Sequence, residues 1–269
     1  MTSTDLLAAI VASAKKAADD RAREMHADVE RAAAIRRPRG PAFVESLRQP
    51  GVRIIAECKR RSPSKGVLRA LYDPVAIAKG YAAAGAAAIS VLTEPAFFDG
   101  SIDHLRDVRA AVDVPVLCKD FLVTEFQIIE ARAAGADAVL LIVAALDDRA
   151  LARLLALAGT LDLAVLVEVH DHVDLERALA AGASLVGVNS RNLRTLEVST
   201  AVFEEMAPRL PEGTTAVAES GLGVPSDLVR LRQRGYRAFL IGERFMTDPD
   251  PGASLATLMA RASGVGVPR

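Results

Sequence analysis

Short runs of apolar residues, rich in Val, Ile and Leu, recur along the whole chain. The runs that predict strands are residues 53–58, 87–92, 114–119, 137–143, 163–169, 184–189, 214–219 and 237–241. Continuous rather than alternating hydrophobicity is typical of strands covered on both faces, as in parallel sheets. Most of the segments between the runs have a helical period. Strand and helix therefore alternate, which predicts repeated βαβ units.

Glycines at the ends of predicted helices repeat this rhythm. The glycines that end a helical segment just before a strand are Gly85, Gly135, Gly182 and Gly235. Glycine accepts the left-handed conformation that commonly ends a helix, and this spacing of about 50 residues corresponds to two βα units. Eight strands in about 200 residues predict a (β/α)8 barrel. A doubly wound open sheet is the alternative, but no G-x-G-x-x-G motif follows the first strand.

The two ends of the chain are predicted to lie outside the barrel. Residues 1–48 form an Ala-rich helical pattern, which predicts an N-terminal extension that packs on the barrel. R-R-P-R-G-P at 36–41 interrupts this pattern, either as a solvated turn or as part of an appendage that caps the barrel or touches substrate. The barrel is expected over residues 49–264, and residues 265–269 are expected to be a disordered tail.

The composition and charge of the chain argue against several classes of partner. The 269 residues are 51% hydrophobic and 25% charged, as in a globular domain, and the net charge is -1. This charge gives no field to attract nucleic acid or a membrane surface. No apolar run reaches the roughly 18 residues of a membrane helix, and the N-terminus lacks the basic start of a signal peptide. We therefore expect a cytoplasmic protein with neither nucleic acid nor membrane as a partner.

Charged side chains follow the predicted strands at their carboxyl ends. Glu57 and Lys59 lie two positions apart and share a face, whereas Cys58 points the other way. Further polar residues at such ends are Lys119, Glu168, Asn189, Arg191 and Glu219. These ends form the rim at which (β/α)8 barrels carry their chemistry. Because buried charges need partners, the cluster predicts a polar pocket in which carboxylates among lysines acquire pKa values shifted in opposite directions.

Small residues follow the last two predicted strands. The segments are E-S-G-L-G at 219–223 and I-G-E at 241–243. The corresponding loops of such barrels usually bind phosphate through backbone N–H groups. S-P-S-K-G at 62–66 adds hydroxyl groups and a cation. Together these segments predict a phosphorylated small-molecule substrate.

Several other candidate side chains are better explained by structural roles. His170 and His172 fit the solvated start of a helix better than a metal site, because no ligand pattern accompanies them, and we expect no metal. Cys58 and Cys118 are expected to pack against the helices. The two phenylalanines at 97–98 can either line a site for an aromatic substrate or pack a loop.

Several stretches of the chain form a specific combination when taken in order. They are I-I-A-E-C-K-R-R-S-P-S-K-G, L-T-E-P-A-F-F-D-G-S, V-L-C-K-D-F, L-V-E-V-H-D, V-G-V-N-S-R-N-L, A-E-S-G and F-L-I-G-E-R-F-M. In this combination the chain resembles the indole-3-glycerol-phosphate synthase family of tryptophan biosynthesis, from about residue 40 to about residue 260. The resemblance implies a lyase that converts 1-(2-carboxyphenylamino)-1-deoxyribulose 5-phosphate into indole-3-glycerol phosphate, CO2 and water, without a cofactor.

The resemblance also implies roles for the charged residues at the rim. Lys119 corresponds to the general acid that protonates the ketone oxygen during ring closure. Lys59 corresponds to the cation that pairs with the carboxylate until CO2 leaves, and it is a possible second acid. Glu168 corresponds to the residue with the main share of the dehydration. Glu57 corresponds to a residue that orients Lys59 or the substrate.

The remaining implied residues bind substrate. Asn189 and Glu219 are expected to bond its hydroxyl and amine groups, and Arg191 to hold carboxylates. The phosphate is expected at Ser62, Ser220, Gly221, Gly242 and, through its backbone N–H, Glu243. The anthranilate ring is expected against Phe98, Phe121, Leu140 and Ile142.

Two rival functions stay open at this point. One is another phosphate-binding barrel enzyme of the same pathway, phosphoribosylanthranilate isomerase, although the E-x-K of the first strand argues against it. The other is a barrel that binds a phosphorylated ligand without catalysis. The Ala-rich surface helices are compatible with a monomer, and association with other tryptophan-pathway enzymes is left open.

Overall fold

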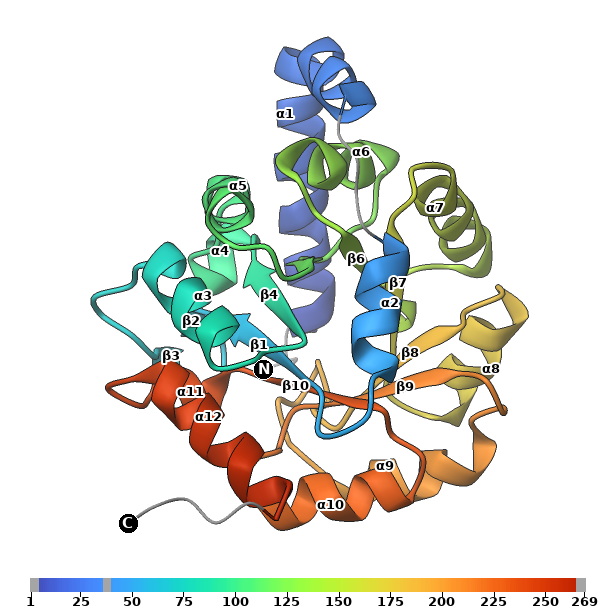
Figure 1. Ribbon diagram of the computed structural model, residues 1–269. Coiled ribbons are helices and arrows are strands. Elements are labelled where there is room, and N and C mark those ends of the chain that lie inside the picture. The colour runs from blue at the N-terminus through green and yellow to red at the C-terminus, as the bar shows by residue number, and fades with distance from the viewer. Residues whose placement is uncertain (1–4, 36–39, 265–269) are drawn as a thin grey trace.

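The structure is a computed structural model that describes residues 5–35 and 40–264, and eight parallel strands in these residues close into a barrel (Figure 1). The barrel strands are β1 (Ile54–Cys58), β4 (Ala88–Leu92), β5 (Val116–Lys119), β6 (Ala138–Ile142), β7 (Ala164–Val169), β8 (Leu185–Asn189), β9 (Thr215–Glu219) and β10 (Ala238–Ile241). The barrel closes where β10 pairs with β1, with Phe239 opposite Ile54. The predicted (β/α)8 fold is confirmed, and each strand lies within its predicted range.

Helices follow the strands, and the longer ones cover the outside of the barrel (Figure 1). They are α3 (Pro74–Ala83), α4 (Pro95–Phe98), α5 (Ile102–Ala111), α6 (Glu125–Ala134), α7 (Asp148–Thr160), α8 (His172–Ala180), α9 (Ala201–Met206), α10 (Pro225–Gln233), α11 (Glu243–Met246) and α12 (Pro251–Ala262), with short 3-10 turns η1 (Val143–Ala145) and η2 (Ala207–Arg209). Asp73 caps α3 and Thr124 caps α6, and each side chain accepts a hydrogen bond from a backbone N–H of the first turn. Gly135 ends α6 with a φ of 97°, a conformation that glycine adopts without steric cost.

The apolar core has two layers because strand side chains alternate in direction. Ile54 and Cys58 belong to the layer between the strands and the helices, whereas Ile55 and Leu117 fill the barrel interior. Cys118 also lies in the outer layer, and both cysteines are buried free thiols. Burial raises the pKa of both thiols. The predicted packing role of the two cysteines is confirmed.

Two helices precede the first strand, α1 (Leu6–Ile35) and α2 (Gly40–Arg48). α1 runs along α6 (Figure 1), where Arg21 makes two hydrogen bonds of 2.8 Å to the carboxylate of Glu130. α2 packs against β4, β7 and β9 and buries Phe43 and Leu47 in the interior layer. Residues 36–39 of the predicted turn and the predicted tail at 265–269 lie outside the described residues. The extension thus covers one helix of the barrel and one end of its interior.

A short hairpin follows β1 and joins two loops at the carboxyl end of the barrel. It consists of β2 (Arg61–Ser62) and β3 (Gly66–Val67) in antiparallel pairing. Arg60 Nη1 lies 2.6 Å from Asp99 Oδ2, and Arg61 Nη1 lies 3.6 Å from Asp99 Oδ1. Because Asp99 ends α4, these ion pairs tie the loop after β1 to the loop after β4.

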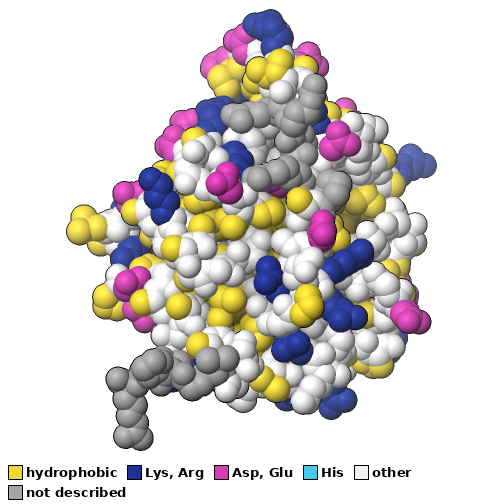
Figure 2. Space-filling model, viewed as in Figure 1, with side chains coloured by type: hydrophobic (Ala, Val, Ile, Leu, Met, Phe, Trp, Pro, Cys, Tyr) yellow, Lys and Arg dark blue, Asp and Glu magenta, His cyan; other side chains and the backbone are white. Residues whose placement is uncertain are grey.

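Charges of both signs share the molecular surface. In Figure 2, several Lys and Arg side chains lie close together in the lower centre of the view, while Asp and Glu side chains are scattered over the same face. The near-zero net charge therefore reflects mixed charges rather than few charges. In the part of the chain that the structure describes, every helix is too short or too polar to span a membrane.

Candidate active site

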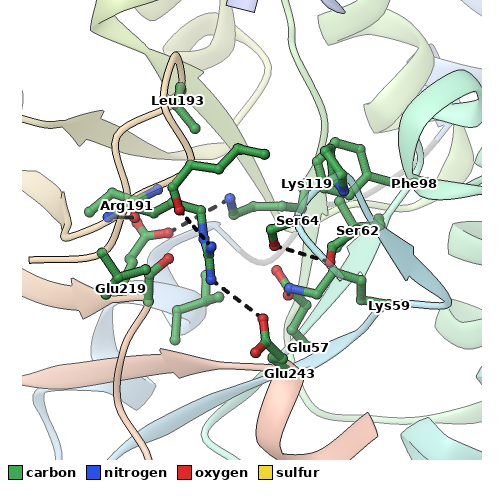
Figure 3. A pocket seen from close by; sticks show the side chains of 18 of the residues that line it. Glu57, Lys59, Ser62, Ser64, Phe98, Lys119, Arg191, Leu193, Glu219 and Glu243 are labelled. Atoms are coloured by element: carbon green, nitrogen blue, oxygen red, sulfur yellow. Dashed lines mark hydrogen bonds and ion pairs between the residues drawn. The ribbon is translucent and has the colours of Figure 1, made fainter. Parts of the chain in front are cut away.

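A cavity of about 820 Å³ opens at the carboxyl ends of the barrel strands. All residues that the sequence assigned to the site line it, namely Glu57, Lys59, Ser62, Phe98, Lys119, Phe121, Leu140, Ile142, Glu168, Asn189, Arg191, Glu219, Ser220, Gly221, Gly242 and Glu243. They come from strand ends and loops that are far apart in the sequence and point toward one space (Figure 3). The barrel thus brings the predicted set together.

Lys119, at the end of β5, is held between two glutamates of other strands. Its Nζ lies 3.2 Å from Glu168 Oε2 and 3.7 Å from Glu219 Oε2. Burial by itself lowers the pKa of Lys119, but the negative charges of Glu168, Glu219 and Glu57 outweigh burial and raise it. Burial raises the pKa of Glu168, whereas the Lys119 ammonium and hydrogen bonds from neighbouring side chains lower it more strongly. This pair is therefore an ammonium and a carboxylate at neutral pH.

Glu219, at the end of β9, has the opposite protonation. Burial, followed by the negative charge of Glu168, raises the pKa of Glu219 to about 8. Its Oε1 is buried and has no hydrogen-bond partner among the described residues. At pH 7 Glu219 is therefore a neutral acid beside the ionised Glu168. The opposite pKa shifts that the sequence predicts for this cluster are confirmed.

A second ion pair faces the cavity from β1. Lys59 Nζ lies 2.5 Å from Glu57 Oε1, and both side chains lie on the cavity side (Figure 3). Gly242 directly follows β10. A Cβ atom at this position would lie 2.4 Å from Glu57 Oε1, so only glycine leaves space for the Glu57 side chain. The site thus needs glycine at Gly242 irrespective of any contact with phosphate.

Gly187, in β8, makes the same kind of room for Glu219. A Cβ atom at this position would lie 2.0 Å from Glu219 Oε1. We expect Gly187→Ala to lower the free energy of unfolding by about 1–3 kcal/mol, because the barrel interior must shift to admit a methyl group. Thermal unfolding measures the loss. Gly159→Ala is the control, since a Cβ atom there meets nothing within 4 Å and α7 favours alanine. Equal melting temperatures for Gly187→Ala and the wild type would contradict the expectation.

Small and cationic residues meet at one end of the cavity. Ser220 and Gly221 both have a φ of 67°, which turns their backbone sharply after β9. Arg191 lies beside this turn, and its Nη2 is 3.4 Å from Glu243 Oε2 (Figure 3). Lys65 of the hairpin lines the same cavity. This end combines cations with a turn formed by small residues, which suits an anionic group.

Apolar side chains line another part of the cavity. The rings of Phe98 and Phe121 lie 6.1 Å apart at a tilt of 34°. Leu6 and Ile10 of α1 line the cavity as well. Of the two phenylalanines at 97–98, the second lines the cavity and the first packs against the interior layer. Both rings pack against the interior layer, and Phe98 also faces the cavity.

The prediction that His170 is solvated is wrong. Only 14% of its side chain is exposed, its Nε2 lies 3.3 Å from Glu168 Oε1, and its Nδ1 lies 3.6 Å from Asp174 Oδ2. β7 ends at Val169, so a residue two positions after Glu168 still lies on the face of Glu168. His172 is exposed, as predicted. Within residues 5–35 and 40–264, no group of three or more His, Cys, Asp or Glu could hold a metal ion.

Further residues line the cavity, although the sequence analysis did not assign them individually to the site. They are Leu6, Ile10, Pro63, Ser64, Lys65, Leu92, Asp120, Leu193, Leu196, Val198, Leu222, Gly223, Leu240, Ile241, Arg244 and Thr247. Asp120 and Ser64 adjoin assigned residues, so proximity in the motif could have indicated them. Leu6 and Ile10 lie in α1, and the sequence around them does not indicate that this helix contacts the cavity.

The comparisons with known proteins all indicate the same family. The family model described as indole-3-glycerol phosphate synthase matches residues 7–258. The chain is 55% identical over 214 residues to the protein of that name from Nocardioides sp., covering 80% of this chain and 82% of the relative. It is 50% identical over 227 residues to the one from Streptomyces griseus, covering 84% of each. It is 46% identical over 254 residues to the one from Mycobacteroides abscessus, covering 94% of this chain and 93% of the relative.

Proposed function

The chain belongs to the indole-3-glycerol phosphate synthase family, and on that premise we propose how its side chains divide the reaction. The enzyme closes the ring of 1-(2-carboxyphenylamino)-1-deoxyribulose 5-phosphate and releases CO2 and water to give indole-3-glycerol phosphate in tryptophan biosynthesis. The observation that carries the assignment is the buried Lys119 ammonium, held between Glu168 and Glu219 in the same cavity as Lys59.

Lys119 acts as the general acid of ring closure. The aryl carbon that bears the carboxylate attacks the ketone carbon, and the ketone oxygen takes a proton from the Lys119 ammonium. The raised pKa keeps Lys119 protonated before the step. As the oxygen gains negative charge, a fixed cation in a water-poor cavity stabilises the transition state more than it does in water.

Lys59 pairs with the substrate carboxylate until CO2 leaves. Its Nζ contacts Glu57 Oε1 at 2.5 Å, so the cation is already held at the cavity wall. When the C–C bond to the carboxylate breaks, the electron pair restores the aromatic ring. Glu57 orients Lys59, because it is buried against Gly242 and has little freedom to move.

Glu168 removes a proton in the dehydration. This step takes a proton from the carbon next to the nitrogen and expels the hydroxyl that ring closure created. The lowered pKa of Glu168 leaves it ionised and able to accept the proton. Lys59 serves as the second acid in this proposal and protonates the leaving hydroxide, so that water departs and the pyrrole ring becomes aromatic. Asn189 and the neutral Glu219 bond hydroxyl and amine groups of the substrate.

The two ends of the cavity separate the two ends of the substrate. The phosphate lies at Ser62, Ser220, Gly221, Gly242 and the backbone N–H of Glu243, and Arg191 holds a carboxylate. The anthranilate ring lies against Phe98, Phe121, Leu140 and Ile142. Both sets of residues line the same cavity, so one substrate molecule can contact them together.

Indole fluorescence tests the proposed function directly. We expect fluorescence to appear when the carboxyphenylamino substrate is added, with one CO2 released for each indole formed. Substrate binding without either product would favour the rival, a barrel that binds a phosphorylated ligand without catalysis. Isomerisation of phosphoribosylanthranilate, measured in the same preparation, tests the rival enzyme. The charged pair Glu57–Lys59 favours the synthase.

We also propose that the protein acts in the cytoplasm and is a monomer, a state with which Ala-rich surface helices such as α1 are compatible. Sedimentation analysis measures the mass of the species in solution. A dimer at micromolar concentration would contradict this proposal.

A further inference from the structure

A chain of charged groups extends from the cavity toward helix α8. Glu168 contacts the cavity cation Lys119 through Oε2, and its other oxygen, Oε1, lies 3.3 Å from His170 Nε2. On the far side of the imidazole, Nδ1 lies 3.6 Å from Asp174 Oδ2. The described contacts therefore leave each oxygen of Glu168 facing a cationic group.

Asp174 is itself fixed in place. Its Oδ2 accepts a hydrogen bond of 3.2 Å from the backbone N–H of His170, and its Oδ1 lies 3.7 Å from Arg177 Nη1. Arg177 in turn pairs with Asp148 and donates to the carbonyl of Val143 at 3.2 Å. Asp174 is buried, so its negative charge faces the imidazole with little screening by water. The carboxylate at α8 thus favours a charged His170.

The charges near the imidazole come from several elements. Glu168 and Asp174 contact it directly, while Lys119 of β5 and Glu219 of β9 lie beyond Glu168. Burial lowers the pKa of His170, but its interactions with Asp174 and Glu168 outweigh burial and raise the pKa to about 9. At neutral pH the imidazole therefore carries a positive charge beside Glu168.

We propose that His170 is a positioning residue for the dehydration: as an imidazolium held by Asp174, it keeps Glu168 ionised and directs its other oxygen toward the cavity. This inference rests on the proposed role of Glu168 as the base. His170 itself is absent from the cavity lining, so it acts through Glu168 rather than on the substrate. A carboxylate held from both sides loses less freedom when it reaches the transition state.

His170→Gln tests the inference, because glutamine keeps a donor toward Glu168 and removes the charge. We expect kcat to fall roughly 10-fold to 100-fold, because Glu168 loses the positive charge that lies 3.3 Å from its Oε1, and KM to change much less. The acid limb of the kcat/KM profile should move to higher pH by about one unit, because Glu168 loses a neighbouring cation. Unchanged kcat with an unmoved acid limb would overturn the inference. A fall in kcat with an unmoved limb would also overturn it, since a packing role predicts that result.

Asp174→Asn is a second variant that keeps the histidine. The asparagine oxygen can still accept the backbone N–H of His170, whereas the charge that favours the imidazolium is gone. We expect the acid limb to move in the same direction as in His170→Gln. His172→Ala is the matched control, because this exposed histidine lies two positions away, and its profile should overlay that of the wild type. A shift as large in His172→Ala would overturn the inference.

The carboxyl pKa of Glu168 separates this inference from the proposed function. Titration of the ¹³C-labelled carboxyl group by NMR should give a higher pKa in His170→Gln than in the wild type. An unmoved carboxyl pKa would overturn the positioning role. A moved carboxyl pKa with unchanged kcat would support the contact but overturn the role of Glu168 as the base.

Discussion

Lys119→Met is expected to lower kcat by about 10³-fold or more while the barrel still folds. General acid catalysis alone contributes roughly 10²–10⁴-fold, and the variant also removes the cation that stabilises the developing oxyanion. Progress curves of indole fluorescence measure the loss, and circular dichroism reports on the fold. Methionine has a similar length, so the apolar stem of the side chain is retained.

The stability of Lys119→Met follows from the charges that remain. Removing one partner of a buried ion pair typically costs about 3–5 kcal/mol, because the other charge is left buried. Here Glu219 is already neutral at pH 7 and Glu168 keeps His170, so we expect the lower end of that range. Lys79→Met on the exposed face of α3 is the control and should keep wild-type activity. Near-normal kcat in Lys119→Met would exclude this lysine as the general acid.

Glu168→Gln is expected to separate CO2 release from indole formation. The amide fits the same space but cannot accept a proton, so dehydration should slow about 10²–10⁴-fold. If Glu168 acts only in the last step, ring closure and decarboxylation still proceed. In a single turnover, CO2 should therefore appear before indole fluorescence, whereas the wild type shows both together.

Measuring CO2 release and indole formation separately identifies the step in which Glu168 acts. Equal slowing of CO2 release and indole fluorescence would place Glu168 at or before ring closure and contradict the proposed division of steps. Glu176→Gln, at an exposed position of α8, is the control and should release both products at the wild-type rate. Loss of the negative charge also leaves Lys119 with fewer anionic neighbours, so its pKa should fall.

The sequence predicted the strands, several helix ends and the strand ends from which the polar residues of the site project. Mostly apolar runs identified every barrel strand, because strands covered on both faces carry few polar residues before their carboxyl ends. The two-residue alternation placed Glu57 and Lys59 on the cavity side and Cys58 among the helices, as the structure has them. These features are local, so they can be read from neighbouring residues.

Only the tertiary structure determined which groups meet across the barrel. The contact of His170 with Glu168, the room that Gly187 leaves for Glu219, and the contribution of α1 to the cavity depend on strand register and helix packing. The opposite protonation of Glu168 and Glu219 depends on distances between strands that are far apart in the sequence. The amino-acid pattern fixes the direction and the strand end of each side chain. Its partners are fixed by closure of the barrel, because Coulomb and steric energies depend on separations in space and not along the chain.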